Sequence, residues 1–139
     1  MAKLITAIGG IENENHMKKP VVIIGYSGHA HTAIDLLHES GYQVTAYCDN
    51  HPKEQNPFGL EYLGSEMDEA VLEKMKQFDY FIGIGNNNLL RQKVYEQVSK
   101  VLGEPVNAIH RTAAISPSVI LTCGHFISAN VSINALTRL

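Results

Sequence analysis

Residues 110–139 read HRTAAI SPSVIL TCGHFI SANVSI NALTRL when they are divided into groups of six. An aliphatic residue ends each group and also precedes the first, which gives the series Ile109, Ile115, Leu121, Ile127, Ile133 and Leu139. This is the hexapeptide repeat of a left-handed parallel β-helix, in which three groups form a triangular coil and the aliphatic side chains stack inside. Small and polar residues fill the corners, as at 116–118 and 128–130. Five groups make fewer than two coils, so we expect the chain to stop inside a domain that it has only begun.

The residues before the repeat alternate between strand and helix patterns. Val21 to Ile24 is a β-branched run closed by Gly25, which is typical of a buried parallel strand. Further strands are predicted over 44–48, 60–63 and 78–84, and helices over 29–40, 67–76 and 87–102, with Ser65 as a cap of the second helix and Gly41 closing the first. This alternation predicts an α/β fold, a small Rossmann-like parallel sheet flanked by helices.

The expected organisation has three parts. Residues 1–16 are interpreted as a leader, tag or upstream extension, because Met17 is followed at once by Lys18-Lys19-Pro20 and the first strand. Residues 17–104 form the Rossmann-like domain, and residues 105–139 begin the β-helix.

Composition narrows the class of protein. The chain is 45% hydrophobic and 18% charged, as in an ordinary globular protein of about one domain. A formal charge of -3, with Lys18-Lys19 as the only adjacent basic pair, argues against a nucleic-acid partner. No run approaches the roughly 18 apolar residues of a membrane span. Cys48 and Cys123 lie in unrelated segments and are read as reduced thiols of a cytoplasmic protein. The spacing of the seven histidines predicts no metal site.

Three loops are candidates for ligand binding, namely Gly25 to Ala30, Asp49-Asn50 and Gly83 to Asn88. Each follows a predicted strand, and ligands of open parallel sheets bind beyond the carboxyl ends of the strands. The helices that follow expose N–H groups suited to a phosphate. The alternative is that the glycines serve turn geometry alone. The first loop is not a dinucleotide fingerprint, because Ser27 stands where the second glycine belongs.

Two charged residues have competing interpretations. Asp49 ends the second strand, where Rossmann-like proteins place a carboxylate on a ribose, but Asp-Asn-His-Pro is also a turn sequence. Arg91 lies one turn into the third helix and can reach a phosphate or sugar, although an exposed helix arginine needs no ligand.

Four stretches together resemble the sialic acid O-acetyltransferase (NeuD) family. They are VVIIGYSGHA at 21–30, YCDN at 47–50, GIGNNNLLR at 83–91 and AIHRTAAISPS at 108–118, and the similarity runs from about Lys18 to Leu139. The family includes bacterial acetyltransferases that modify nucleotide-linked amino sugars for glycans. The resemblance implies a Rossmann-like domain that holds a nucleotide sugar, a β-helix that binds the co-substrate acetyl-CoA between subunits, and a homotrimer.

The resemblance also implies roles for particular residues. Gly25, Ser27, Gly28 and His29 would line the sugar and pyrophosphate, Asp49 and Asn50 the nucleoside, and Gly85, Asn87 and Arg91 the opposite wall. Three departures are His31 in place of Lys or Arg, Arg111 in place of proline, and the bulky Tyr26, which would narrow the sugar pocket. The family's general base is a histidine expected beyond Leu139, so no catalytic residue is assigned. The chain is therefore read as the substrate-binding portion of the enzyme, inactive alone.

Two other classes of function remain open from the sequence. An NAD- or CoA-binding Rossmann regulatory domain would explain the first hundred residues but not the hexads. A non-catalytic interaction module would leave the glycine loops as turns.

Overall fold

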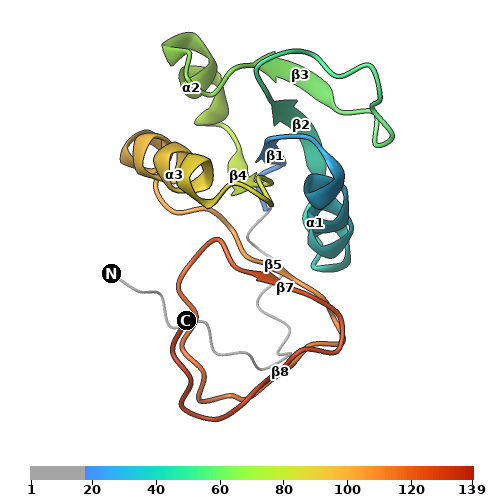
Figure 1. Ribbon diagram of the computed structural model, residues 1–139, viewed down its shortest axis with the longest axis vertical. Coiled ribbons are helices and arrows are strands. Elements are labelled where there is room, and N and C mark those ends of the chain that lie inside the picture. The colour runs from blue at the N-terminus through green and yellow to red at the C-terminus, as the bar shows by residue number, and fades with distance from the viewer. Residues whose placement is uncertain (1–17) are drawn as a thin grey trace.

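A computed structural model describes residues 18–139 as a parallel sheet with helices on both faces, followed by a triangular coil (Figure 1). The sheet has the order β3-β2-β1-β4 and is parallel throughout. Its strands are β1 (Val21–Ile24), β2 (Val44–Cys48), β3 (Glu61–Gly64) and β4 (Asp79–Ile82), and its helices are α1 (Gly28–Glu39), α2 (Glu69–Met75) and α3 (Asn88–Leu102). The predicted α/β fold is confirmed. The leader predicted at 1–16 lies outside the described residues.

The core lies on both faces of the central strand. All four residues of β1 are fully buried, and they point alternately to the two faces as strand geometry requires. Val21 and Ile23 pack in one cluster with residues of α1, while Val22 and Ile24 pack in a second cluster with residues of α2 and α3. Each helix therefore buries its apolar side against one face of β1.

Most predicted elements are confirmed to within a few residues, and one predicted cap is wrong. Asp68, not Ser65, caps α2, because its Oδ1 accepts the Ala70 N–H at 2.9 Å. Ser65 instead accepts the Met67 N–H within the preceding turn. The sequence suggested Ser65 because it follows Gly64 directly, but the helix starts one turn later. Gly41 follows the last residue of α1 with a φ of 83°, the left-handed conformation that glycine adopts most easily.

The coil has the period that the hexads predict. Its short strands are β5 (Ala108–Ile109), β6 (Ala114–Ile115), β7 (Phe126–Ile127) and β8 (Ser132–Ile133). Parallel partners are separated by 18 residues in each of the three ladders, which are Ala108 with Phe126, Ala114 with Ser132, and Ile120 with Arg138. Three hexads therefore complete one triangular coil, and the next coil stacks on it (Figure 1). The left-handedness of the coil stays a prediction.

The inside of the coil is small. Leu121 and Ile127 are buried as predicted, together with Val119. Ile109, Ile115 and Ile133 pack around them and are partly buried, whereas Leu139 is 45% exposed. Ala113, Val119 and Val131 lie two positions before the predicted residues and face the same cluster, because side chains two apart on a strand share a face.

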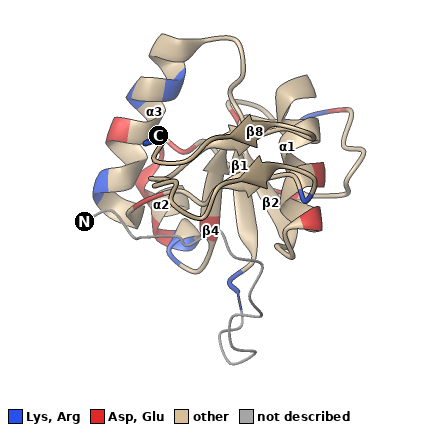
Figure 2. Cartoon of the chain, turned by 90° about the horizontal axis from the view of Figure 1, so that it is seen from below, with Lys and Arg blue, Asp and Glu red and all other residues tan. Residues whose placement is uncertain are grey.

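Charges of both signs are mixed on the described surface. Along α3, the basic residues Arg91, Lys93 and Lys100 are interrupted by Glu96 (Figure 2). Among residues 18–139, no helix combines the length and the apolar character that crossing a membrane requires.

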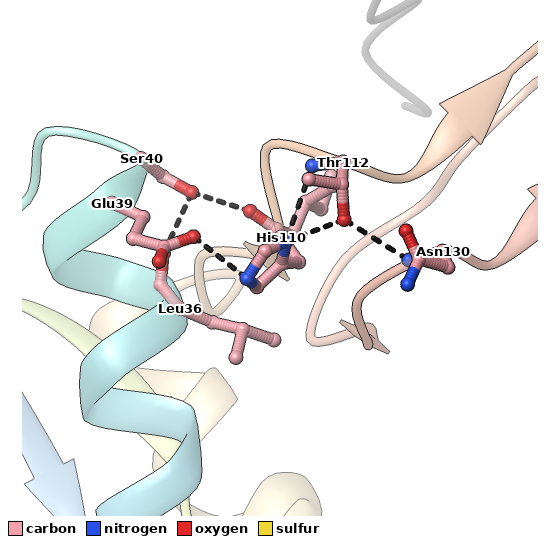
Figure 3. A network of polar contacts seen from close by, with 7 residues as sticks. Leu36, Glu39, Ser40, His110, Thr112 and Asn130 are labelled. Carbon is pink, nitrogen blue, oxygen red and sulfur yellow. Dashed lines mark hydrogen bonds and ion pairs between the residues drawn. The ribbon is translucent and has the colours of Figure 1, made fainter.

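A chain of polar contacts joins the end of α1 to the coil (Figure 3). Ser40 Oγ donates to the Ile109 carbonyl at 2.7 Å, and His110 Nε2 lies 3.0 Å from Glu39 Oε2. The Thr112 N–H donates to His110 Nδ1, which leaves the ring proton on Nε2, facing Glu39. Thr112 Oγ1 in turn accepts an N–H from the second coil. These contacts therefore attach the first coil to α1 on one side and to the second coil on the other.

Three corners of the second coil have left-handed backbones, and one of them is strained. Gly124, Asn130 and Leu136, six residues apart, all have a left-handed φ between 60° and 71°. The N–H groups of Asn130 and Leu136 donate to Thr112 Oγ1 and Ser118 Oγ, one coil back. Asparagine and glycine tolerate this conformation, but leucine does not. Leu136 is also 80% exposed, so it gains nothing from burial at this corner.

Leu136→Asn is expected to stabilise the second coil by about 1 kcal/mol, because asparagine relieves the left-handed strain. Amide exchange at Leu139 measures this directly, since its N–H donates to the Ile120 carbonyl at 3.0 Å. That amide should exchange about fivefold more slowly in the variant. Leu89→Asn is the matched control, because Leu89 is 81% exposed within the helix α3. An equal effect of both substitutions would show that backbone strain at the corner is not the cause.

Candidate functional site

A cleft of about 360 Å³ opens at the carboxyl ends of the strands. All three loops predicted from the sequence contribute to it, and a fourth loop, after β3, contributes as well. The lining residues are Gly25, Tyr26 and Ser27 after β1, Asp49, Asn50 and Lys53 after β2, Glu66 and Met67 after β3, Gly83 to Asn86 after β4, and Leu90 and Lys93 of α3. The convergence follows from the parallel sheet, because every strand delivers its carboxyl end to the same edge.

The β1–α1 turn offers hydrogen-bond donors to this cleft. Ser27 is the N-cap of α1, yet among the described residues its hydroxyl makes no capping bond. The His31 N–H donates to the Ser27 carbonyl at 3.0 Å, so the amides of Gly28, His29 and Ala30 precede the first bond of the helix. Free N–H groups and the positive end of the helix dipole together favour an anion.

The glycines bring the first and third loops into contact with each other. Gly25 has a φ of 81°, and a Cβ there would lie 2.9 Å from Ile84 Cγ1. A Cβ on Gly83 would lie 2.8 Å from Ala30 Cβ, and one on Gly85 would lie 2.6 Å from the His29 ring. Close packing between the two loops therefore requires glycine at all three positions. It also explains the cleft, because this contact forms one of its walls.

Asp49 connects the first and second loops. Its Oδ2 accepts the Tyr26 N–H at 3.0 Å and lies 3.2 Å from Lys53 Nζ, while its Oδ1 accepts the Asn50 N–H at 2.8 Å. The side chain is 19% exposed and faces the cleft. The turn role inferred from Asp-Asn-His-Pro is thus present in the structure, and the same carboxylate is placed at the predicted binding edge.

Tyr26 borders the cleft, but its side chain belongs to the core. The ring is 2% exposed and lies 4.6 Å from the Tyr47 ring. Its hydroxyl donates to Asn56 Oδ1 at 2.8 Å and accepts the Phe58 N–H at 3.2 Å. The expectation that Tyr26 narrows the sugar pocket is therefore wrong. The Tyr26 hydroxyl instead anchors the polar loop that contains Lys53, through Asn56 and Phe58.

Sequence reasoning missed three charged residues of the cleft, namely Lys53, Glu66 and Lys93. Lys53 lies in the polar loop after Asp49. Glu66 is 7% exposed, and its Oε2 has no hydrogen-bond partner in the described part of the chain. Burial raises the pKa of Glu66, its own backbone N–H lowers it, and Asp49 raises it further. The signal in the sequence is that Glu66 closely follows the third predicted strand, so it lies at the same edge of the sheet as the other three loops.

Some of the residues that the sequence predicted for the binding site do not line the cleft. Gly85 lines the cleft, but Asn87 caps α3, because its Oδ1 accepts the Leu90 N–H at 3.0 Å. Gly28 begins α1 and is exposed beside Ser27. Arg91 does not line the cleft, because its guanidinium donates to the Ile84 carbonyl at 3.1 Å and to Asn88 Oδ1 at 2.9 Å.

His29 and Arg91 face a second cavity, of about 220 Å³, between the sheet and the coil. The His29 ring lies 4.7 Å from the ring of Phe126, and His125 completes this side of the cavity. Burial lowers the pKa of His29, and the positive charge of Arg91 lowers it further. The predicted site is thus divided into a nucleotide-sized cleft and a smaller cavity toward the coil. Within residues 18–139, no three potential metal ligands cluster.

Two of the solved structures that resemble this chain come from Caulobacter crescentus, and a third is an acetyltransferase domain. A variant of perosamine N-acetyltransferase from Caulobacter crescentus, in complex with CoA and GDP-perosamine, is 35% identical with a TM-score of 0.75. PerB of the same organism, with the same ligands, is 34% identical with a TM-score of 0.73. The acetyltransferase domain of PglB from Neisseria gonorrhoeae, in complex with acetyl coenzyme A, shares the fold at 23% identity and a TM-score of 0.65, over 78% of this chain and 52% of its own.

The compared proteins are longer than this chain. The match to the two Caulobacter structures covers 86% of this chain and 56% of theirs. A protein of Acanthamoeba polyphaga mimivirus, named only as uncharacterized protein L142, is 29% identical over 119 residues, which are 86% of this chain and 23% of the viral protein.

A family model matches residues 20–98, which include all of the sheet, α1, α2 and most of α3. Its description is the PglD N-terminal domain. The match spans more than half of the 139 residues. The chain therefore belongs to the PglD N-terminal domain family.

Proposed function

We propose that this chain is the nucleotide-sugar-binding portion of an acetyl-CoA-dependent sugar N-acetyltransferase of bacterial glycan biosynthesis. The observation that carries the proposal is the cleft where four strand ends converge, in a chain 35% identical to an enzyme crystallised with CoA and GDP-perosamine. A nucleotide-linked amino sugar is accordingly the proposed substrate, in preference to sialic acid. Acetylation of nitrogen is proposed over oxygen because the Caulobacter crescentus enzyme that is 35% identical to this chain is a perosamine N-acetyltransferase.

The pyrophosphate is proposed to lie against the start of α1. The Ser27 hydroxyl and the amides of Gly28 and His29 supply donors there. Lys53 and Lys93 line the same cleft and add positive charge from the second loop and from α3. Asn50 and Asp49 would contact the nucleoside, and Gly25 and Gly85 allow the loops on either side to close around the phosphates.

Acetyl transfer requires a base that removes a proton from the sugar amine as the nitrogen attacks the thioester carbonyl and the CoA thiolate leaves. The described residues that line the cleft include no histidine. His110 is paired with Glu39, and His125 contacts Thr122 Oγ1 at 3.1 Å. We therefore propose that the base and the acetyl-CoA site are formed by β-helix coils other than those of residues 105–139, in a homotrimer. Residues 17–104 are the proposed nucleotide-sugar domain.

The cysteines fit a reducing compartment. Cys48 and Cys123 are both free thiols, and burial raises the pKa of Cys48 to about 12, so its thiol stays protonated and unreactive. The proposed site of action is the cytoplasm.

Asp49→Ala is expected to weaken the binding of a nucleoside diphosphate sugar by about 1–3 kcal/mol, because the proposed charge-assisted hydrogen bond from the nucleoside to this carboxylate is lost. Calorimetry with UDP-, GDP- and dTDP-sugars measures the change. The exposed Asp35 of α1 does not line the cleft, so Asp35→Ala is the matched control. If a folded Asp49→Ala variant keeps full affinity, Asp49 is a turn residue only. Binding of NAD with no heat from any nucleotide sugar would favour the regulatory-domain alternative.

The 139-residue chain is expected to bind a nucleotide sugar without transferring acetyl groups, because no base lies in its cleft. The release of CoA thiol from acetyl-CoA, followed with a thiol reagent in the presence of amino-sugar nucleotides, should not exceed the rate without protein. Turnover that is abolished by His125→Ala or His110→Ala would contradict this, and would identify the base.

A further inference from the structure

The fourth loop of the cleft contains a carboxylate whose buried oxygen lacks a partner. Glu66 follows β3 and is 7% exposed, and its Oε2 accepts no hydrogen bond within residues 18–139. Lys53, which lines the same cleft, is paired with Asp49 at 3.2 Å. A buried carboxylate oxygen without a donor is costly, and a bound ligand that supplies the donor would remove this cost.

The position of Glu66 along the cleft indicates which part of a ligand it meets. The sheet order β3-β2-β1-β4 places the loop after β3 two strands away from the loop after β1. Neighbouring strands lie about 4.8 Å apart, so Glu66 is about 10 Å from the donors around Ser27. That is of the order of the separation between the phosphates and the base in an extended nucleotide. Asp49 and Asn50, after β2, lie between the two ends.

Met67, the next residue in the chain, can pack against the flat face of an aromatic ring. Met67 also lines the cleft and is 38% exposed, and thioether side chains make favourable contacts with aromatic faces. A base lying against Met67 would turn its edge toward the Glu66 carboxyl group. Phosphates at the other end of the cleft, near Lys53, Lys93 and the start of α1, would keep their charge away from this carboxylate.

The chemistry of a carboxylate selects among the bases. An ionised carboxylate only accepts hydrogen bonds, and it binds best to two adjacent N–H donors. Guanine presents such a pair on its N1–H and N2–H₂ edge. Uracil and thymine present one N–H between two carbonyl oxygens, and those oxygens would repel the carboxylate. Cytosine and adenine present an amino group beside a bare ring nitrogen.

We propose that Glu66 reads the base of the nucleotide sugar and selects guanine, which makes the substrate a guanosine diphosphate sugar. This inference rests on the proposed function, since it requires that a nucleotide occupy the cleft. Glu66 would then determine which nucleotide sugar is bound, and the loop after β3 would contact the base.

The test measures the binding of GDP-mannose, UDP-N-acetylglucosamine, guanosine diphosphate and inosine diphosphate by calorimetry. It uses the wild-type chain, Glu66→Gln and Glu69→Gln. GDP-mannose should bind the wild type at least tenfold more tightly than UDP-N-acetylglucosamine does. Inosine diphosphate lacks the N2 amino group, so it should bind about tenfold more weakly than guanosine diphosphate. Glu66→Gln should lose about tenfold in affinity for GDP-mannose and little for UDP-N-acetylglucosamine, because its amide group places a donor against a donor.

The control Glu69→Gln makes the same chemical change at an exposed residue of α2, which does not line the cleft, and should change nothing. Denaturation by urea checks that Glu66→Gln remains folded. Equal binding of the guanine and uracil nucleotides, or full GDP-mannose affinity in Glu66→Gln, would overturn the assignment of Glu66 and leave the proposed function standing. If no nucleotide binds the wild type, the proposed function fails as well.

Discussion

The burial of β1 on both faces is the constraint on which the rest of the structure depends. Its four residues have no exposed surface, and each such side chain contributes about 1.5–3 kcal/mol when it is buried. The strand can be covered on both faces only if helices lie on both sides, and its hydrogen bonds are complete only with β2 and β4 alongside. The parallel direction of these partners then places the loops after all of them at one edge. The cleft is therefore a consequence of how β1 is buried.

The coil depends on the same sheet. The Val106 N–H donates to the Tyr80 carbonyl at 2.9 Å, so the chain runs beside β4 before it enters the first hexad. Ser40 and Glu39 at the end of α1 then hold Ile109 and His110 (Figure 3). Because these contacts join the first coil to both β4 and α1, the cavity containing His29 and Phe126 lies at a defined junction between the sheet and the coil.

The features of this fold that depend on local sequence patterns could be predicted from the sequence. The run at 21–24, the alternation of strands with helices and the period of six each depend on residues close together in the chain. Contacts between distant residues could not be predicted. Asp49 was placed at the binding edge, but its bond to the Tyr26 N–H connects loops 23 positions apart. The sequence likewise did not indicate that the Tyr26 hydroxyl donates a hydrogen bond to Asn56, so that the ring is buried in the core and not in the cleft. Arg91 was one turn into α3 as expected, but its direction depends on the Ile84 carbonyl.

The most direct test of the account is to find where a nucleotide sugar binds. A titration of ¹⁵N-labelled protein with a nucleoside diphosphate sugar, followed by NMR, reports each backbone amide separately. If the nucleotide sugar binds in the cleft, the largest shifts occur at Ser27, Gly28 and His29 and at Asn50 and Glu66, and the amides of the coil beyond residue 110 stay nearly unchanged. Shifts concentrated around Cys123 and the coil, with none in the loops after β1 and β2, would contradict it.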